Sequence, residues 1–292
     1  MAGALSSTGR IIDVGTEGSI MLELYHHGNS VCAQKVRLAL EEKRLDWREH
    51  FVDILAGEQF RPEYLRLNPK AVVPTLIHDG AIIRESTVIC EYLDDVFPAP
   101  ALRPADAFGR ARMRLWTKLV DESLHAACTA VTFSTYFRFT MLDLLPEKAF
   151  SMPADELDAL ALATINPTIL QRKRAWLVSG LDAPDVKGAF KAFDKALADM
   201  EQALAEGPWL LGREYSLADI GATPYVSRLE NLSLTGMWDS SRPRVAEWYA
   251  RIKQRPNFAT AITRWIPEPD MNAMMSYGAA NWPRIERILA MA

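Results

Sequence analysis

The chain has 292 residues, of which 49% are hydrophobic and 24% charged, and its formal net charge is −4. This composition is typical of a folded protein with a substantial core, and the length predicts two domains. The near balance of charges gives no reason to expect nucleic acid or a membrane as a partner, and no apolar run approaches the roughly 20 residues that span a bilayer.

Residues 1–20 mix Gly, Ser, Thr and single charges, without the apolar stretch of a secretory signal, so we expect a loose extension. The three cysteines, Cys32, Cys90 and Cys128, are odd in number and match no disulfide or zinc spacing. A reducing, cytoplasmic location is the simplest expectation. The five histidines show no ligand spacing with these cysteines, so no bound metal is expected.

Strand-like and helix-like segments alternate up to about residue 98. The predicted strands are 21–26, 46–53, 75–78 and 81–84. One predicted helix begins after Ser30, an irregular one covers 56–67, and a third begins after Ser86. Asp79-Gly80 is a strong hairpin signal between the last two strands. The resulting order β-α-β-α-β-β-α is that of a thioredoxin-like domain, with a parallel crossover and an antiparallel hairpin. In its first helix, Cys32 belongs to an apolar stripe with polar residues opposite.

Pro98, Pro100 and Pro104 interrupt the chain and predict a linker over 99–105. Beyond it nearly everything predicts helix, with a long one over 106–130, a less regular region over 131–185 and another helix near 187–206. Ser216 and Asp219 have capping-box spacing, flanked by a hydrophobic staple. We therefore expect an extension (1–20), an α/β thioredoxin-like domain (21–98), the linker, and an all-α domain (106–292).

Three local features of the first domain point to one kind of ligand. Ser30 lies between a strand end and a helix start, where backbone N–H groups and the helix dipole favour an anion such as a thiolate. Val73-Pro74 stands directly before a strand, where a cis peptide would turn the Val73 backbone toward a ligand. Glu85 and Ser86 lie at the start of a helix. The Glu85 carboxylate suits an ammonium group, and the Ser86 hydroxyl and N–H suit a carboxylate. Each feature also has a purely structural interpretation, as a helix cap or a trans proline.

Taken together, these segments resemble the glutathione transferases of the serine type. The runs 29–37, 68–74, 85–93 and 216–220 resemble, in order, the first-helix motif of that family, its loop before a cis-proline, its γ-glutamyl motif and its helical capping motif. The resemblance covers about residues 21–260. It implies that glutathione is the co-substrate, that Ser30 stabilises its thiolate, that Val73 and Pro74 bind its cysteine, and that Glu85 and Ser86 hold its γ-glutamyl end.

Segments 78–98, 102–106 and 112–122 are more narrowly similar to the bacterial β-etherases, which use glutathione to cleave the β-aryl ether bond of lignin-derived dimers. That resemblance implies a dimeric enzyme that attacks an aromatic ether and releases a phenol. The first-helix motif departs toward generic bacterial transferases, and Val72 replaces a glutamine that the family often has. A general transferase or peroxidase for electrophilic xenobiotics, and a non-catalytic interaction subunit of the same fold, remain as alternatives.

Cys32 is the rival nucleophile, because it lies in the first helical turn, where a thiol pKa can fall. Its place in an apolar stripe favours a packed core thiol instead. For the aromatic co-substrate, we expect a pocket between Ser30, the long helix and segment 131–180. Phe133, Tyr136 and Phe137 are its main candidates, with Phe139, Met141 and Trp176 nearby in sequence.

Overall fold

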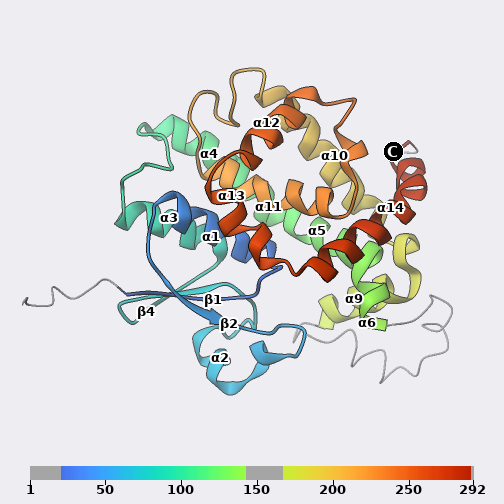
Figure 1. Cartoon of the computed structure of the whole chain (residues 1–292), viewed down its shortest axis with the longest axis horizontal. Coiled ribbons are helices and arrows are strands. Elements are labelled where there is room, and N and C mark those ends of the chain that lie inside the picture. The colour runs from blue at the N-terminus through green and yellow to red at the C-terminus, as the bar shows by residue number, and fades with distance from the viewer. Residues whose placement is uncertain (1–20, 143–166, 291–292) are drawn as a thin grey trace, which may run out of the picture.

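The computed structural model describes residues 21–142 and 167–290. Figure 1 shows a small mixed sheet with helices on both faces and, packed against one side of it, a larger assembly made of helices alone. This is the α/β thioredoxin-like unit followed by the all-α unit that the element order predicted.

Four strands form the sheet, in the order β2-β1-β3-β4. β1 runs parallel to β2, whereas β3 is antiparallel to both β1 and β4. In the β3–β4 hairpin Leu76 lies opposite Ile83, and Asp79 and Gly80, both at positive φ, make the turn that their dipeptide predicted. The strands are β1 (Leu22–His26), β2 (Arg48–Phe51), β3 (Thr75–His78) and β4 (Ala81–Arg84).

Helices cover both faces of this sheet because its strands alternate. Leu22, Leu24 and Leu76 are buried under α1 (Val31–Glu42) and α3 (Ser86–Val96). Tyr25 points to the opposite face and joins a small cluster with Tyr64 of α2. The irregular helix predicted over 56–67 consists of a short 3-10 turn, η1 (Glu58–Phe60), and α2 (Pro62–Leu67).

The polar residues opposite the apolar stripe of α1 are not exposed. Gln34, Lys35 and Arg37 are as fully buried as the apolar stripe that includes Val36 and Leu40. α1 packs against α3 on one side and against α11 (Leu217–Asn231) and α13 (Asn257–Ala261) of the helical unit on the other. Its polar side chains therefore lie between the two units, where Lys35 and Arg37 hydrogen-bond to other segments.

The long helix predicted over 106–130 continues further than expected. α4 (Ala107–Leu119), a π-helical turn η2 (Val120–Leu124), α5 (His125–Thr132), a second π turn η3 (Phe133–Phe137) and α6 (Arg138–Leu142) follow one another without a break. Asp106 caps this rod through Gly109 N at 2.8 Å. π turns frequently occur at functional sites, because they shift the side chains that follow around the helix.

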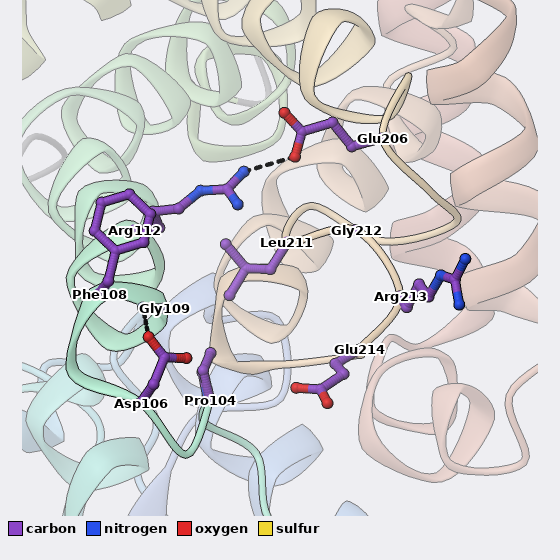
Figure 2. Close-up of a pocket in the computed structure, with 10 residues that line it drawn as sticks. All are labelled: Pro104, Asp106, Phe108, Gly109, Arg112, Glu206, Leu211, Gly212, Arg213 and Glu214. Atoms are coloured by element: carbon purple, nitrogen blue, oxygen red, sulfur yellow. Dashed lines mark hydrogen bonds and ion pairs between the residues drawn. The ribbon is translucent and has the colours of Figure 1, made fainter.

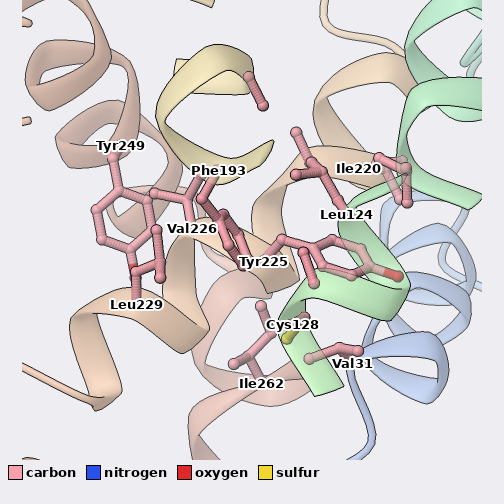
Figure 3. Packing of buried hydrophobic residues seen from close by; sticks show 14 of the residues in the cluster. Val31, Leu124, Cys128, Phe193, Ile220, Tyr225, Val226, Leu229, Tyr249 and Ile262 are labelled. Atoms are coloured by element: carbon pink, nitrogen blue, oxygen red, sulfur yellow. The ribbon is translucent and has the colours of Figure 1, made fainter. Parts of the chain in front are cut away.

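The remaining helices surround this rod, and α14 (Glu268–Ala290) closes one side of it (Figure 1). Figure 3 shows the centre of the core, where Tyr225 and Val226 of α11 pack among Leu124, Cys128 and Phe193. The others are α9 (Pro167–Ser179), η4 (Gly180–Asp182), α10 (Val186–Ala203), η5 (Thr235–Met237), α12 (Pro243–Lys253) and η6 (Thr263–Trp265).

The predicted capping box of α11 is confirmed. Ser216 accepts from the first turn, and the Asp219 carboxylate accepts from Ser216 N at 3.0 Å. Asp219 also accepts from Leu210 N and from the indole of Trp248, at 3.0 and 2.9 Å. Because its carboxylate is fully buried, burial raises the pKa of Asp219 to about 6 against the pull of these donors.

Candidate active site

Ser30 is the residue at which the β1–α1 turn becomes helix. Its backbone is extended, and its Oγ accepts from Ala33 N at 3.3 Å, which is the N-cap arrangement that the sequence predicted. Since Oγ accepts in that bond, the hydroxyl keeps its own hydrogen for another acceptor. The positive end of the α1 dipole also favours an anion at this position. An anion beside Ser30 would meet both the hydroxyl and the helix terminus.

The Val73–Pro74 peptide is cis, as the family resemblance implied, and both residues are buried. Tyr25 near the end of β1 lies opposite Thr75 at the start of β3, and Thr75 lies opposite Arg84 at the end of β4. These pairings bring the Ser30 turn, the Pro74 loop and the Glu85-Ser86 segment to the same edge of the sheet.

Glu85 and Ser86 differ in detail from the expectation that Ser86 caps α3. The helix begins at Ser86 itself, and Glu85 occupies the N-cap position without a side-chain cap bond. The physical reason is the left-handed backbone of Glu85, with φ of 66°, which turns the chain from β4 directly into helix. Such conformations concentrate at functional sites. The Glu85 carboxylate is exposed and pairs with Lys70 Nζ at 2.7 Å.

Two buried arginines, Arg37 of α1 and Arg228 of α11, link the Ser30 turn to the helical unit. Arg37 donates to Gly28 O at 2.8 Å and to Ala261 O at 2.7 Å. Arg228 of α11 donates to Asn29 O at 2.7 Å and also contacts the Asn29 side chain. Burial lowers the pKa of Arg228. Its acceptors on Asn29 and Thr132 are all neutral oxygens. The residue next to Ser30 is therefore anchored from outside its own domain.

A second polar cluster lies on the other side of the first turn of α1, and sequence reasoning missed most of it. Cys32 Sγ lies 3.4 Å from His125 Nδ1 and 3.9 Å from the Tyr225 hydroxyl. Cys32 packs against the core on one side but remains partly exposed, and His125 is exposed at the start of α5. The prediction of a packed core thiol is therefore only half right: a helical stripe does not tell which part of it faces a cleft.

Charged groups extend this cluster. The buried Lys35 Nζ donates to Asp121 Oδ1 at 3.1 Å and to Thr87 Oγ1 at 3.2 Å. Burial by itself raises the pKa of the Cys32 thiol, but the charge and hydrogen bond of His125, together with Lys35 and the Ser86 hydroxyl, lower it to about 6. The Cys32 thiolate in turn raises the pKa of His125. Both shifts favour a Cys32 thiolate beside a protonated His125.

The predicted co-substrate residues form an aromatic cluster in η3. Phe133 and Tyr136 are buried and Phe137 is half-buried, with ring centroids 5.1 Å apart for Phe133–Phe137 and 4.8 Å for Tyr136–Phe137. Phe133 also packs on Trp176 of α9 at 5.6 Å. Burial and Asp270 of α14 raise the pKa of Tyr136 to about 12. Phe139 stacks on Tyr277, and the side chain of Met141 lies outside the described residues.

The described residues also line hollows at other positions, one of which reaches Tyr25 near the end of β1. Figure 2 shows one of about 430 Å³ between the start of α4, with Asp106 and Arg112, and the loop around Glu206. A hollow of about 590 Å³ lies beside Tyr64 of α2. Within residues 21–142 and 167–290 no group of three or more His, Cys, Asp or Glu could hold a metal, and no helix is long and apolar enough to cross a membrane.

Family models and known relatives agree with this architecture. The model of the glutathione S-transferase N-terminal domain matches residues 29–96, and that of its C-terminal domain matches residues 170–251. The chain is 33% identical to protein LigF of Sphingobium sp. strain SYK-6 over 80% of this chain and 90% of LigF. It is 31% identical to the tetrachloro-p-hydroquinone reductive dehalogenase of Sphingobium chlorophenolicum, over 82% and 95% of the two chains.

The chain belongs to the glutathione S-transferase family, in which glutathione is the co-substrate. Among solved structures it is similar to the β-etherase LigF of Sphingobium sp. strain SYK-6, with a TM-score of 0.71 and 30% identity over 83% of this chain and 99% of that one.

Proposed function

We propose that this protein is a glutathione transferase that cleaves β-aryl ether bonds of lignin-derived aromatic dimers. The observation that carries the proposal is Ser30, whose hydroxyl hydrogen is free for a thiolate at the N-terminus of α1, in a chain similar to LigF over most of its length. The glutathione thiolate attacks the carbon that bears the aryloxy group, next to a carbonyl. The carbon–oxygen bond breaks, a phenolate leaves, and a glutathione thioether remains.

Glutathione is proposed to lie along the sheet edge described above. Its cysteine would pair with the backbone of Val73, in the loop shaped by Pro74. Its γ-glutamyl ammonium would meet the Glu85 carboxylate, and its γ-glutamyl carboxylate the N–H and hydroxyl of Ser86 at the start of α3. The exposed pair of Lys70 and Glu85 supports this polarity, since it holds both charges at that end of the site.

The task of the protein in this reaction is to lower the pKa of the thiol and to orient the two substrates. Ser30 serves the first purpose. We propose that Phe133, Tyr136 and Phe137 serve the second, as one wall of an aromatic pocket. Tyr136 supports that placement, because Arg228, whose charge affects the pKa of Tyr136, also hydrogen-bonds Asn29 next to Ser30.

The test combines glutathione with an aryloxy ketone, in which a phenol is linked to the carbon beside a carbonyl, and measures both released phenol and thioether. A matched ether without the carbonyl is the control substrate. Release of phenol from the ketone, but not from the control ether, supports the proposal. Loss of most of that activity in Ser30→Ala assigns the thiolate role to Ser30. Glutathione binding without phenol release would contradict ether cleavage.

A general glutathione transferase is the second candidate. The similarity to a reductive dehalogenase, at nearly the same identity as to LigF, favours it. It predicts turnover of chlorodinitrobenzene with glutathione at a rate above that of the aryloxy ketone. An interaction subunit without catalysis predicts that neither substrate is turned over.

We also propose a dimer that acts in a reducing cytoplasm. Ile82 of β4, Val88 of α3, and Phe108 and Leu115 of α4 are exposed, and Arg114 of α4 hydrogen-bonds Glu91 of α3, so these elements are neighbours. An apolar surface of this kind is typical of an interface. Val88→Glu with Leu115→Glu should shift the sedimentation coefficient to that of a monomer. The free cysteines support the reducing compartment.

A further inference from the structure

His125 lies on the open side of the polar cluster around the first turn of α1. Its Nδ1 lies 3.4 Å from Cys32 Sγ and 3.4 Å from the Tyr225 hydroxyl, so this nitrogen already has protein partners. The opposite ring nitrogen, Nε2, has no hydrogen-bond partner in the described part of the chain, and the residue is exposed. The imidazole therefore has one side held by the protein and the other side free for a molecule that binds beside it.

Cleavage of an aryl ether leaves a negative charge on the departing oxygen. An unsubstituted phenol has a pKa of about 10, like the side chain of tyrosine, so its phenolate is a poor leaving group at neutral pH. Proton transfer to such a group in the transition state typically contributes about 10²- to 10⁴-fold to a rate. Ser30 does not supply this proton, because its hydroxyl is assigned to the glutathione thiolate. The proposed reaction therefore needs an acid from another residue.

We propose that His125 is the general acid of the proposed ether cleavage, in which the Nε2–H of its imidazolium protonates the phenolic oxygen as the carbon–oxygen bond breaks. This role rests on ether cleavage as proposed above and adds a catalytic residue to it. It also defines the substrate class more closely. The ethers of unactivated phenols, whose oxygen needs a proton in order to leave, become substrates.

The position of His125 along the long rod of helices supports this role. Its partner Cys32 is two residues from Ser30, in the same turn of α1, and the Ser86 hydroxyl hydrogen-bonds Cys32 from the start of α3. In the other direction, Phe133 follows His125 about two helical turns further along the rod. The leaving oxygen joins the carbon that the thiolate attacks to the aryl group. It would therefore lie between the Ser30 turn and the proposed aromatic wall, which is the interval that His125 occupies.

The surroundings of His125 favour its protonated form. The Cys32 thiolate, by charge and by its hydrogen bond, raises the pKa of His125 against the effect of burial. The other titratable and charged groups that face the pair are Lys35 on α1, Asp121 on η2 and Tyr225 on α11. Lys35 and Asp121 are bound to each other at 3.1 Å, so their charges largely offset.

Tyr225 and Cys32 are not the acid themselves. Tyr225 is fully buried, and burial raises its pKa well above the usual value, so its proton is neither accessible nor easily lost. The pKa of Cys32 is lowered to about 6, which favours the thiolate over the thiol that would have to donate. Cys32 is therefore a positioning residue, which orients the imidazole and holds its positive charge.

The proton and electron balance closes with glutathione and the ether alone. Glutathione binds as the thiolate after its thiol proton has passed to solvent. A carbon–sulfur bond forms, and the carbon–oxygen bond breaks with its electron pair on the phenolic oxygen. That oxygen takes the Nε2 proton, and His125 regains a proton from solvent once the phenol has left. Glutathione and the ether thus give the thioether and the phenol, and Cys32 ends unchanged.

The experiment compares two ketones that differ only in the leaving group, phenoxyacetophenone and its para-nitrophenoxy analogue. Nitrophenolate is much the weaker base and leaves without a proton. We expect His125→Gln to lower kcat/KM for the phenoxy ketone by about 100-fold and that for the nitrophenoxy ketone by less than about threefold. Glu122→Gln, which changes an exposed residue bound to Lys118 on the same rod, is the matched control and should leave both values unchanged.

The pH dependence separates proton donation from a structural role. In the ratio of the phenoxy rate to the nitrophenoxy rate, ionisation of the glutathione thiol cancels, because both ketones need the thiolate. This ratio should fall as the pH rises through the pKa of the His125 imidazolium, and it should be flat in His125→Gln. In Cys32→Ser the fall should move to lower pH by about 1–3 units, because the thiolate no longer stabilises the imidazolium.

The outcomes distinguish this role from the reaction itself. If the wild-type protein binds glutathione by calorimetry but releases neither phenol, ether cleavage fails and the role of His125 fails with it. Release of nitrophenol alone, an equal loss on both ketones in His125→Gln, or a wild-type ratio that does not change with pH overturns only the role of His125. An unmoved pH dependence in Cys32→Ser overturns the part assigned to Cys32. A loss confined to the phenoxy ketone supports the general acid.

Discussion

The two sides of the first turn of α1 are built in different ways. On the side of Ser30, the candidate site consists of turns and helix starts: the N-cap itself, the Val73–Pro74 loop and the start of α3, all within the first 86 residues. On the side of Cys32, it consists of side chains from far along the chain, with His125 and Tyr225 separated from Cys32 by 93 and 193 residues.

This difference predicts which parts of the candidate site tolerate amino-acid substitutions. A backbone N–H or a helix terminus keeps its place as long as the local turn forms, so a single substitution removes only one of several donors. A cluster of side chains from distant helices depends on how the two units pack. We therefore expect substitutions that disturb the packing of the helical unit to have larger effects than substitutions at the proposed glutathione site.

The largest expected effect is at Asp219, which combines a local cap with two distant partners. In Asp219→Ala the buried donors of Leu210, Ser216 and Trp248 lose their acceptor. We expect the free energy of unfolding to fall by about 3–5 kcal/mol, since each unpaired buried donor costs roughly 1–3 kcal/mol. Denaturation with urea measures it. Asp199→Ala, on the exposed face of α10, should change it by less than about 0.5 kcal/mol.

Arg228 tests whether the helical unit positions the Ser30 turn. Arg228→Met removes the hydrogen bonds to Asn29 while it keeps most of the buried side-chain volume. We expect kcat/KM for the ether to fall by roughly 10- to 100-fold, as hydrogen bonds to charged groups are worth about 1.5–3 kcal/mol. Arg228→Lys should restore part of the loss. An unchanged pKa of the bound glutathione thiol in both variants would show that Arg228 acts only on folding.

Ser30→Ala tests the glutathione side directly. The hydroxyl is one donor among several, since the N–H groups of the α1 terminus remain. We expect the fold to persist and the pKa of the bound glutathione thiol to rise by about one unit, which corresponds to about 1.4 kcal/mol. A titration of thiolate absorbance in the glutathione complex measures it. An unchanged titration curve would remove the role assigned to Ser30.

The smallest effects are expected at the aromatic cluster. Truncation of Phe133, Tyr136 or Phe137 to Ala should raise KM for the aryl ether several-fold and leave glutathione affinity nearly unchanged. Phe137 is the most informative, because it is half-buried while the other two are buried and also support the fold. Calorimetry with glutathione and ether kinetics are run on each variant. Normal cleavage by all three would mean that the pocket lies elsewhere.

Local spacing in the sequence was sufficient for most elements of the first unit and for one helix cap of the second. Asp79-Gly80 predicted the hairpin, Ser30 the start of α1, and Ser216 with Asp219 the cap of α11, because turns and caps depend on residues only a few positions apart. The cap of α3 was mispredicted by one residue, because the left-handed backbone of Glu85 is not encoded by a glycine.

The sequence by itself thus determined the order of the elements, the fold class and the turns at Ser30, Pro74 and Glu85, all of which follow from neighbours along the chain. Only the tertiary structure decided the partners of Cys32. His125 has no local signal, and it reaches Cys32 because the rod of α4 and α5, with its π turn, crosses the start of α1. The burial of Lys35 and Arg37 was likewise decided by the packing of the helical unit on α1, which no periodicity of a single helix can reveal.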